Sequence, residues 1–276
     1  PGDSITAKQL CAVKPELFAR TKIYVVGAND LPTAGLKDGK PWTWQPQELP
    51  LRQTPLYEEH LRLGQKEFMV PFGGWKMPVR YGSILEEHQT VRTAAGLFDV
   101  SHMGVLEFRG PHAARFLDAM TSNYVAWLRD GEASYGYLLT PTGHVLDDIL
   151  VYRRKWDRLM VVVNAANAEK DEAWFRAAAT GEHFLDDQRK AIRFDAAPEI
   201  VNLKAESSGK DRRVDCALQG PRSLDVLAAA ANNPRLIETL RMKKRFELVE
   251  DSIDGIPAII ATTGYTGEQV GFEILV

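Results

Sequence analysis

The chain has few cysteines and no apolar run long enough to cross a membrane. Cys11 and Cys216 are the only cysteines among 276 residues, and neither lies in a Cys-x-x-Cys pair or near a pair of histidines. The longest apolar runs, such as Leu159 to Val163 and Ile256 to Ala261, have the length of strands, and no leader with a basic start and an apolar middle is visible. We therefore expect no disulfide framework, no metal site and no membrane span. A reducing compartment is expected, the cytoplasm or, in a eukaryote, the mitochondrial matrix.

An excess of positive charge is also missing. Lys and Arg number 34 against 37 Asp and Glu, which gives a net charge of −3, and the basic residues are scattered. This distribution lacks the basic stripe that binds a phosphate backbone, so no nucleic-acid partner is expected. The nucleotide patterns Gly-x-x-x-x-Gly-Lys-Ser/Thr and Gly-x-Gly-x-x-Gly do not occur, and neither does the hydrolase pattern Gly-x-Ser-x-Gly. Nucleotide-dependent and serine-hydrolase chemistry are therefore disfavoured.

The apolar fraction is large enough for a substantial core. Hydrophobic residues make up 45% of the chain, which suits one large domain or two intertwined subdomains. Residues 1–53 are polar and rich in proline, and they predict an irregular N-terminal arm, with one candidate strand at Lys22–Val26 that would dock on the body. The regular body is expected from Thr54 to Val276. Within it, the charged and weakly periodic stretch from Glu182 to Arg213 predicts a solvated insertion.

Helical and strand-like periods mix in this body without the βαβ rhythm of a parallel sheet. Helices are expected at Tyr57–Leu63, Ile84–Ala95, Pro111–Thr121, Ala168–Ala179 and Pro221–Ala231, and strands at Phe68–Phe72, Val105–Arg109, Ala133–Leu139, Val145–Tyr152, Leu159–Asn164, Asp215–Leu218, Phe246–Val249 and Ala258–Thr262. Gly96 is expected to cap the second helix at its C-terminus. The predicted class is α+β, with mixed antiparallel sheets and helices packed on one face.

The most informative segment is the hairpin from Tyr135 to Tyr152. Two adjacent acids, Asp147 and Asp148, interrupt its otherwise apolar second strand. The strand period of two places Asp148 on the face of Leu150 and Tyr152, and Asp147 on the opposite face. A carboxylate among apolar neighbours finds a partner, has a raised pKa or faces a polar cavity, and the last two situations are common in active sites. Because an arbitrary Asp pair more often makes a salt bridge or caps a turn, the pattern alone does not establish catalysis.

Other segments could be functional or simply structural. The glycine pair in Phe72-Gly-Gly-Trp predicts a tight turn. The segment Gly264-Tyr-Thr-Gly-Glu predicts a loop with Tyr265 exposed at its tip, where an aromatic ring can stack on a flat ligand. Glu273 falls in the next predicted strand and His102 at the start of another. Taken alone, a surface role for this Glu and a structural hydrogen bond for this His are the commoner explanations.

The order of the motifs is more informative than any single one. In succession the chain contains Thr54-Pro-Leu-Tyr-Glu-Glu-His, Phe72-Gly-Gly-Trp-Lys-Met-Pro-Val, Gly96-Leu-Phe-Asp-Val-Ser-His-Met, Val145-Leu-Asp-Asp, Val163-Asn-Ala-Ala-Asn-Ala-Glu-Lys-Asp, Leu218-Gln-Gly-Pro and Thr263-Gly-Tyr-Thr-Gly-Glu. This series resembles the T-protein family, the tetrahydrofolate-dependent aminomethyltransferases of the glycine cleavage system. The resemblance begins at Thr54 and implies a GcvT-like folate-binding fold.

The resemblance also implies an activity and a site. A one-carbon unit would pass from the aminomethyl-lipoyl arm of a carrier, the H-protein, to tetrahydrofolate, with release of ammonia. Asp148 matches the catalytic residue beside the folate. The positions that match folate-cavity or pterin contacts are Met103, Tyr135, Tyr152, Val162 through its backbone, Asn164, Tyr265 and Glu273.

Two departures and two alternatives accompany this resemblance. The family's later Arg-bearing motif and C-terminal β-barrel have no counterpart up to Val276, so this chain is expected to lack that part. Another folate-dependent module could accept dimethylglycine, sarcosine or an O-methyl donor instead. A folate-binding protein without turnover, like the related iron-sulfur maintenance proteins, is the other alternative. Those proteins carry a Cys-containing signature that is absent here, and the retained Asp148 favours an enzyme.

Overall fold

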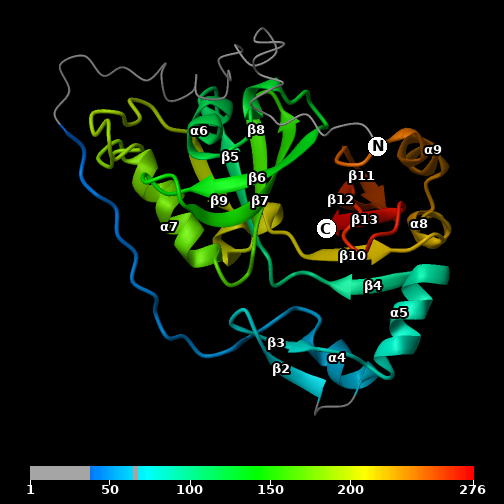
Figure 1. Ribbon diagram of the computed structural model, residues 1–276. Helices are drawn as coiled ribbons and strands as arrows, with labels where there is room; N and C mark the ends of the chain where they lie inside the picture. The colour runs from blue at the N-terminus through cyan, green and yellow to red at the C-terminus, as the bar shows by residue number, and fades with distance from the viewer. Residues whose placement is uncertain (1–37, 65–67) are drawn as a thin grey trace, which may run out of the picture.

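Two five-stranded sheets form the centre of the fold, and helices lie on the outer side of each (Figure 1). The computed structural model describes residues 38–64 and 68–276. In the first sheet the strands lie in the order β6, β7, β8, β5 and β9, each antiparallel to its neighbours. Their bounds are Ala133–Leu139, Val145–Lys155, Arg158–Val163, Gly104–Arg109 and Glu199–Asn202.

Two helices, α6 (Ala113–Met120) and α7 (Ala168–Ala179), cover the outer face of the first sheet. Both carry buried residues three or four positions apart, so that one side of each helix faces the strands. Phe116 of α6 stacks on Phe194 with ring centroids 4.3 Å apart. Trp174 of α7 is 1% exposed in the same core. Full burial of one such ring contributes about 1.5–3 kcal/mol to folding, so this core fixes α7 against the sheet.

The second sheet has the strand order β11, β12, β13, β10 and β4, again all antiparallel. Its strands are Leu248–Ile253, Ile256–Thr262, Gly271–Leu275, Asp215–Gln219 and Gly96–Asp99. Helices α8 (Ser223–Ala231) and α9 (Pro234–Met242) pack on its outer face. The periodicity of the sequence had not predicted α9, although Asn233 caps it by accepting a hydrogen bond from the Leu236 amide at 3.1 Å.

The inner faces of the two sheets share a third core. Leu150 and Tyr152 of β7 lie in it together with Leu275 of β13, whereas Ile149 and Val151 face α6 and α7. The alternation predicted for the hairpin is therefore confirmed. Because neighbouring residues of a strand point to opposite faces of the sheet, the Asp147 and Asp148 side chains also lie on opposite faces.

The N-terminal part adds a small sheet and two helices. Its elements are β1 (Arg52–Gln53), α4 (Tyr57–Leu63), β2 (Met69–Phe72), β3 (Trp75–Pro78) and α5 (Ile84–Thr93), and the 3-10 turns Val125–Trp127 and Glu206–Asp211 lie farther along the chain. The predicted tight turn joins β2 to β3. Gly73 and Gly74 have φ values of 54° and 85°, the left-handed region that glycine adopts without steric cost.

The predicted α+β class with antiparallel sheets and flanking helices is confirmed, and helices cover one face of each sheet as expected. Two details were wrong. Helix α5 ends before Ala94, and Gly96 begins β4, where a Cβ atom would lie 2.6 Å from a methyl group of Val91. Gly96 therefore permits a close approach rather than a cap. The candidate strand Lys22–Val26 lies outside the described residues.

The second error concerns Glu182–Arg213, which is not a solvated insertion. Its strand β9 pairs with β5, and Ile192 and Phe194 are buried in the core under α6 and α7. Short apolar segments lie between the charged residues of this stretch. They show neither the helical period nor the strand period, so the sequence pattern does not reveal them.

Candidate functional site

The hairpin of β6 and β7 brings Asp148 beside a tyrosine and an asparagine. The register partner of Asp148 on the facing strand is Tyr137. Tyr135 lies two residues from this partner on the same face, and its hydroxyl donates to Asp148 Oδ2 at 3.2 Å. Strand β8 ends at Val163, so the next residue, Asn164, leaves the ladder and donates from Nδ2 to Asp148 Oδ1 at 3.0 Å. Each carboxylate oxygen thus has one donor, and the carboxylate is held in one orientation.

A cavity of about 320 Å³ opens beside this carboxylate, between the two sheets. Its volume lies within the range of about 300–1,000 Å³ that is usual for small-molecule sites. The residues that line it are Phe98, Val100, Met103, Tyr135, Asp148, Ile149, Leu150, Val162, Asn164, Ala217, Gln219, Tyr265, Thr266 and Glu273. Every site residue expected from the sequence is among them except Tyr152.

Tyr152 lies behind the cavity wall. Its side chain is fully buried in the core between the sheets, and its hydroxyl donates to Glu273 Oε2 at 2.9 Å. Burial raises the pKa of Tyr152, and Glu273 raises it further, so the hydroxyl keeps its proton. Tyr152 therefore orients Glu273 rather than forming the wall itself.

Glu273 is the most deeply buried acid of the cavity wall, with 4% of its surface exposed. Burial raises its pKa, while the hydroxyl of Tyr152 and the positive charge of Lys204 oppose this increase. An acid in this position can exchange hydrogen bonds with a polar ligand in a site from which water is largely excluded.

Aromatic rings border the opening of the cavity. Tyr135, Phe98 and Tyr265 remain 45%, 39% and 57% exposed. Hydrogen bonding with Tyr137 and the nearby Asp148 raise the pKa of Tyr135 to about 12, so its hydroxyl is a proton donor at neutral pH. A flat aromatic ligand can stack on such rings.

Some lining residues were missed by sequence reasoning. Phe98 and Gln219 lie in motifs that had been recognised, Gly96-Leu-Phe-Asp and Leu218-Gln-Gly-Pro, but no role had been assigned to them. Gln219 is 1% exposed and donates to Thr263 Oγ1 at 3.1 Å, which aims its amide along the wall. Strands β4 and β10 are neighbours in the second sheet, and only this pairing brings the two motifs together.

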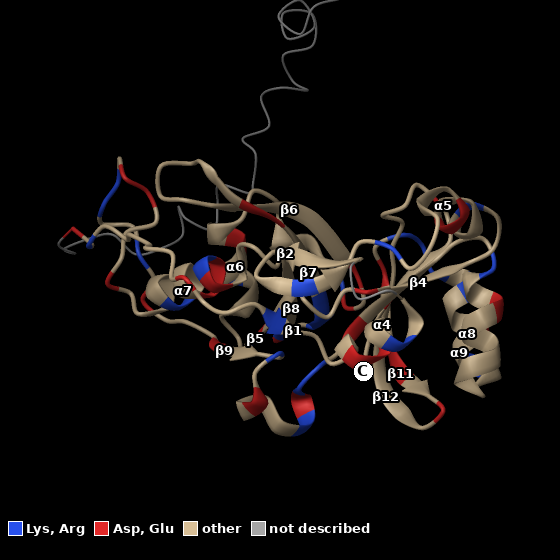
Figure 2. Cartoon of the chain, turned by 90° about the horizontal axis from the view of Figure 1, so that it is seen from below, with Lys and Arg blue, Asp and Glu red and all other residues tan. Residues whose placement is uncertain are grey.

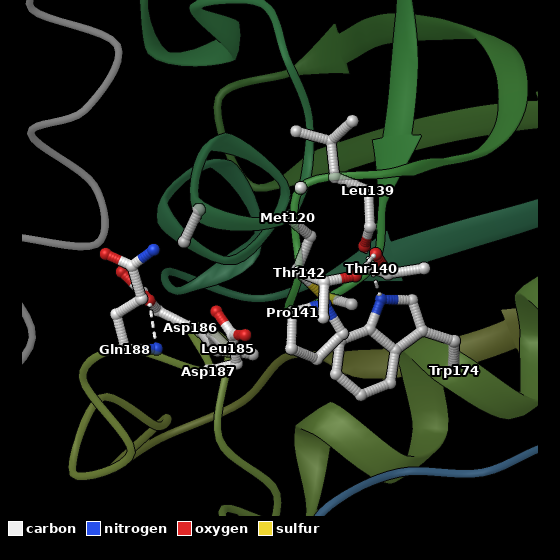
Figure 3. A pocket seen from close by; sticks show the side chains of 12 residues that line it. Met120, Leu139, Thr140, Pro141, Thr142, Trp174, Leu185, Asp186, Asp187 and Gln188 are labelled. Atoms are coloured by element: carbon white, nitrogen blue, oxygen red, sulfur yellow. Dashed lines mark hydrogen bonds between the residues drawn. The ribbon is translucent and has the colours of Figure 1, made fainter.

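A second cavity of about 320 Å³ lies at the turn of the same hairpin (Figure 3). The indole of Trp174 borders it and donates to the Leu139 carbonyl oxygen at 3.0 Å. Asp186 and Asp187 stand on its other side. This cavity offers one aromatic side chain, already held by a backbone oxygen, whereas three aromatic rings and several convergent polar groups surround the cavity at Asp148. The latter is therefore the better candidate site.

Residues of both charge signs are mixed along the part of the chain that the structure describes. Figure 2 shows acidic and basic residues interspersed over helices and strands. In the part of the chain that the structure describes, no helix combines the length and apolar character needed to traverse a lipid bilayer.

Comparison with known proteins shows the family and agrees with the fold. The model of the GCVT N-terminal domain matches residues 56–276, most of the chain. The chain belongs to this family. Its fold is also similar to the crystal structure of glycine cleavage system aminomethyltransferase T from Bartonella henselae, with a TM-score of 0.64 and 33% identity over 82% of this chain and 54% of that one.

Curated relatives of the chain are also named aminomethyltransferases. The aminomethyltransferase of Symbiobacterium thermophilum is 42% identical over 82% of this chain and 54% of its own length. That of Rubrobacter xylanophilus is 42% identical over 81% of this chain and 52% of its own. The chain thus spans about half the length of the curated relatives it matches. The resemblance predicted from the motif series is confirmed at the level of the family.

Proposed function

We propose that the protein supplies the tetrahydrofolate site of an aminomethyltransferase of the glycine cleavage system. The reaction moves a one-carbon unit from the aminomethyl-lipoyl arm of a carrier, the H-protein, to tetrahydrofolate and releases ammonia. One observation carries the proposal. The Asp148 carboxylate, held by Tyr135 and Asn164, faces an aromatic-walled cavity that has Glu273 at its inner end.

The groups around the cavity fit a pterin. A pterin is flat and carries hydrogen-bond donors and acceptors on its edge, so it suits a site that combines rings with a few oriented polar groups. Tyr135 and Tyr265 supply rings, and Glu273 and Asn164 supply polar edges. Met103 and the backbone of Val162 would complete the contacts. Tyr152 supports Glu273 from behind.

The side chains of the site have distinct tasks in this reaction. Bound tetrahydrofolate supplies the nitrogen atoms that take up the one-carbon unit. Asp148 accepts a proton from the substrate or returns one to it, while Tyr135 and Asn164 hold its oxygens in place. General acid-base catalysis contributes about 10²–10⁴-fold to a rate. Alignment of two reactants can contribute about 7–11 kcal/mol, so positioning carries the larger share.

The proposed partner and compartment follow from this reaction. The carrier must bring its flexible arm to the open, aromatic side of the cavity, where Phe98 and Tyr265 remain exposed. A reducing cytoplasm or mitochondrial matrix is the proposed location.

A donor assay tests the proposal. Full-length protein is incubated with tetrahydrofolate and, separately, the aminomethyl-loaded carrier, dimethylglycine, sarcosine or a methoxy donor, and the one-carbon folate product is measured. We expect product and ammonia only with the loaded carrier. Product from one of the other donors would assign the protein to a demethylase-type module, and folate binding without product from any donor would indicate a binding protein.

Replacing Glu273 by Ala is expected to weaken folate binding about 10–100-fold, the usual worth of a hydrogen bond to a charged group. The measurement is the dissociation constant by calorimetric titration. Tyr152→Phe is the matched comparison, because Tyr152 lies behind Glu273 and its loss removes one hydrogen bond to Glu273 while the acid itself remains. We expect the folate affinity of this variant to decrease about 2–10-fold. An equal loss in both variants would mean that Tyr152 itself contacts the folate.

A further inference from the structure

The first acid of the pair, Asp147, points away from the cavity into a closed polar cluster. Its side chain is 4% exposed. It accepts hydrogen bonds from the Asn164 amide N–H at 2.8 Å, from Asn164 Nδ2 at 3.0 Å and from Asn167 Nδ2 at 2.5 Å. A buried carboxylate with this many donors is fixed in place.

A second buried acid, Asp171, faces this cluster from α7. It lies one helical turn after Asn167, and none of its surface is exposed. No N–H or O–H donor of the described residues reaches either oxygen of Asp171. Asn167, one turn earlier at the start of α7, donates to Asp147, which places Asp171 beside the same carboxylate. Because a carboxylate cannot donate, a hydrogen bond between the two acids requires a proton on Asp171.

The charges around Asp171 agree with a neutral acid. Burial raises its pKa, and hydrogen bonding to Asp147 raises it further, to about 9. Two neighbouring carboxyl groups in a low-dielectric interior share one proton because both cannot be ionised at low cost. Lys170 opposes this increase, but its ammonium group is bound to the Leu146 carbonyl oxygen and to Asn167 Oδ1, at 2.9 Å each.

The Asn164 amide connects this cluster to the cavity. The same Nδ2 that donates to Asp147 also donates to Asp148 Oδ1 and to the Asp148 carbonyl oxygen, at 3.0 Å each. An amide nitrogen has two N–H groups, and both are needed to serve two neighbouring carboxylates. If the Asp147 side chain rotated, the orientation of Asn164 would change. Asp148 would then lose the hydrogen bond from Asn164, which is one of the two that hold its carboxylate.

We propose that Asp171 is a positioning residue, a neutral carboxylic acid whose proton fixes the Asp147 carboxylate. Asp147 in turn fixes the Asn164 amide, and this amide directs the Asp148 carboxylate into the cavity. The proposal rests on the proposed catalytic role of Asp148. Asp171 touches neither the cavity nor any substrate, so it acts through Asp147 and Asn164 alone.

The test compares Asp171→Asn and Asp171→Leu in the full-length protein. The Asn amide keeps a donor for Asp147, so its kcat at pH 7 is expected within about 3-fold of wild type. Leu has a similar size but no donor, and a loss of about 10–100-fold in kcat is expected, as for other residues that orient a reacting group from behind. The folate dissociation constant should change less than kcat does in both variants, because Asn164 is the only proposed pterin contact that depends on Asp147. Equal kcat values for the two variants would overturn the proposal.

The pH profile separates positioning from packing. In wild type, kcat is expected to fall as the pH rises through about 9, because Asp171 then loses the proton that holds Asp147. The charged groups that face Asp171 are Asp147 on β7 and Lys170 on α7, and both remain in Asp171→Asn. The variant should therefore lack this decrease. A decrease that persists unchanged in Asp171→Asn would contradict the proposal, even if Asp171→Leu does not fold.

An infrared measurement gives a readout independent of activity. Wild type at pH 7 is expected to show a protonated-carboxyl band that Asp171→Asn removes, and absence of that band overturns the proposal. Asp148→Asn serves as the reference for the proposed function. If it keeps full turnover, the role assigned to Asp148 fails whatever the infrared band shows. If only Asp148→Asn loses turnover, the inference about Asp171 fails alone.

Discussion

Asp148→Asn is expected to bind tetrahydrofolate nearly as well as wild type and to lose about 10²–10⁴-fold in turnover. The amide has the same shape as the carboxylate. Its oxygen can accept from Asn164 and its nitrogen can donate to the hydroxyl of Tyr135, so the local contacts survive. What it loses is the ability to take up and return a proton. Binding and turnover should therefore separate in this variant.

Single-turnover kinetics and calorimetric titration of the same preparation measure both quantities. The control is Asp187→Asn, the same substitution at an exposed acid beside the other cavity of the hairpin, and it should leave both unchanged. Turnover of Asp148→Asn at the wild-type rate would remove Asp148 from the mechanism. A parallel loss of folate affinity would assign it to binding instead.

Phe194→Ala is expected to lower the free energy of unfolding by about 3–5 kcal/mol. Phe194 is 5% exposed, and its ring stacks on Phe116 in the core that joins α6 and α7 to the first sheet. Removing the ring leaves a cavity that the surrounding side chains fill only in part. Because this core also places Asp171 of α7 beside the hairpin, the site would lose rigidity with it.

Urea denaturation measures this change. Gln188→Ala, at an exposed position of the same stretch, is the control and should change the free energy of unfolding by about 0.5 kcal/mol or less. A small effect for Phe194→Ala would mean that Glu182–Arg213 is a solvated insertion, as its composition alone indicates.

Local pattern was sufficient for most of the fold. The alternation of β7 and the apolar spacing of α6 and α7 follow from residues close together in the sequence, and the structure places these elements within a few residues of the predicted bounds. Strand β9 and helix α9 were not predictable in this way. β9 is short and lies in a charged region, and it forms a strand because it pairs with β5. The residues that determine it are therefore distant in the sequence.

The site residues likewise divide into those that the sequence predicts and those that depend on how distant elements pack. Asp148 could be recognised because an acid in an apolar strand is unusual. The resemblance of the motif series supplied six more lining residues as expectations, but not Phe98 or Gln219. The position of Tyr152 behind Glu273 could not be predicted, since it depends on how β7 of one sheet meets β13 of the other. The position of Asp171 beside Asp147 likewise depends on the packing of α7 against the sheet. Strand parity indicated only that Asp147 lies on the face opposite Asp148.

A structure of the full-length protein with bound tetrahydrofolate tests the central claim most directly. The account predicts the pterin in the cavity between the two sheets, against the rings of Tyr135 and Tyr265, with Glu273 and Asp148 at hydrogen-bond distance. A pterin bound in the cavity of Figure 3, or anywhere that leaves Asp148 without contact to it, would contradict the account.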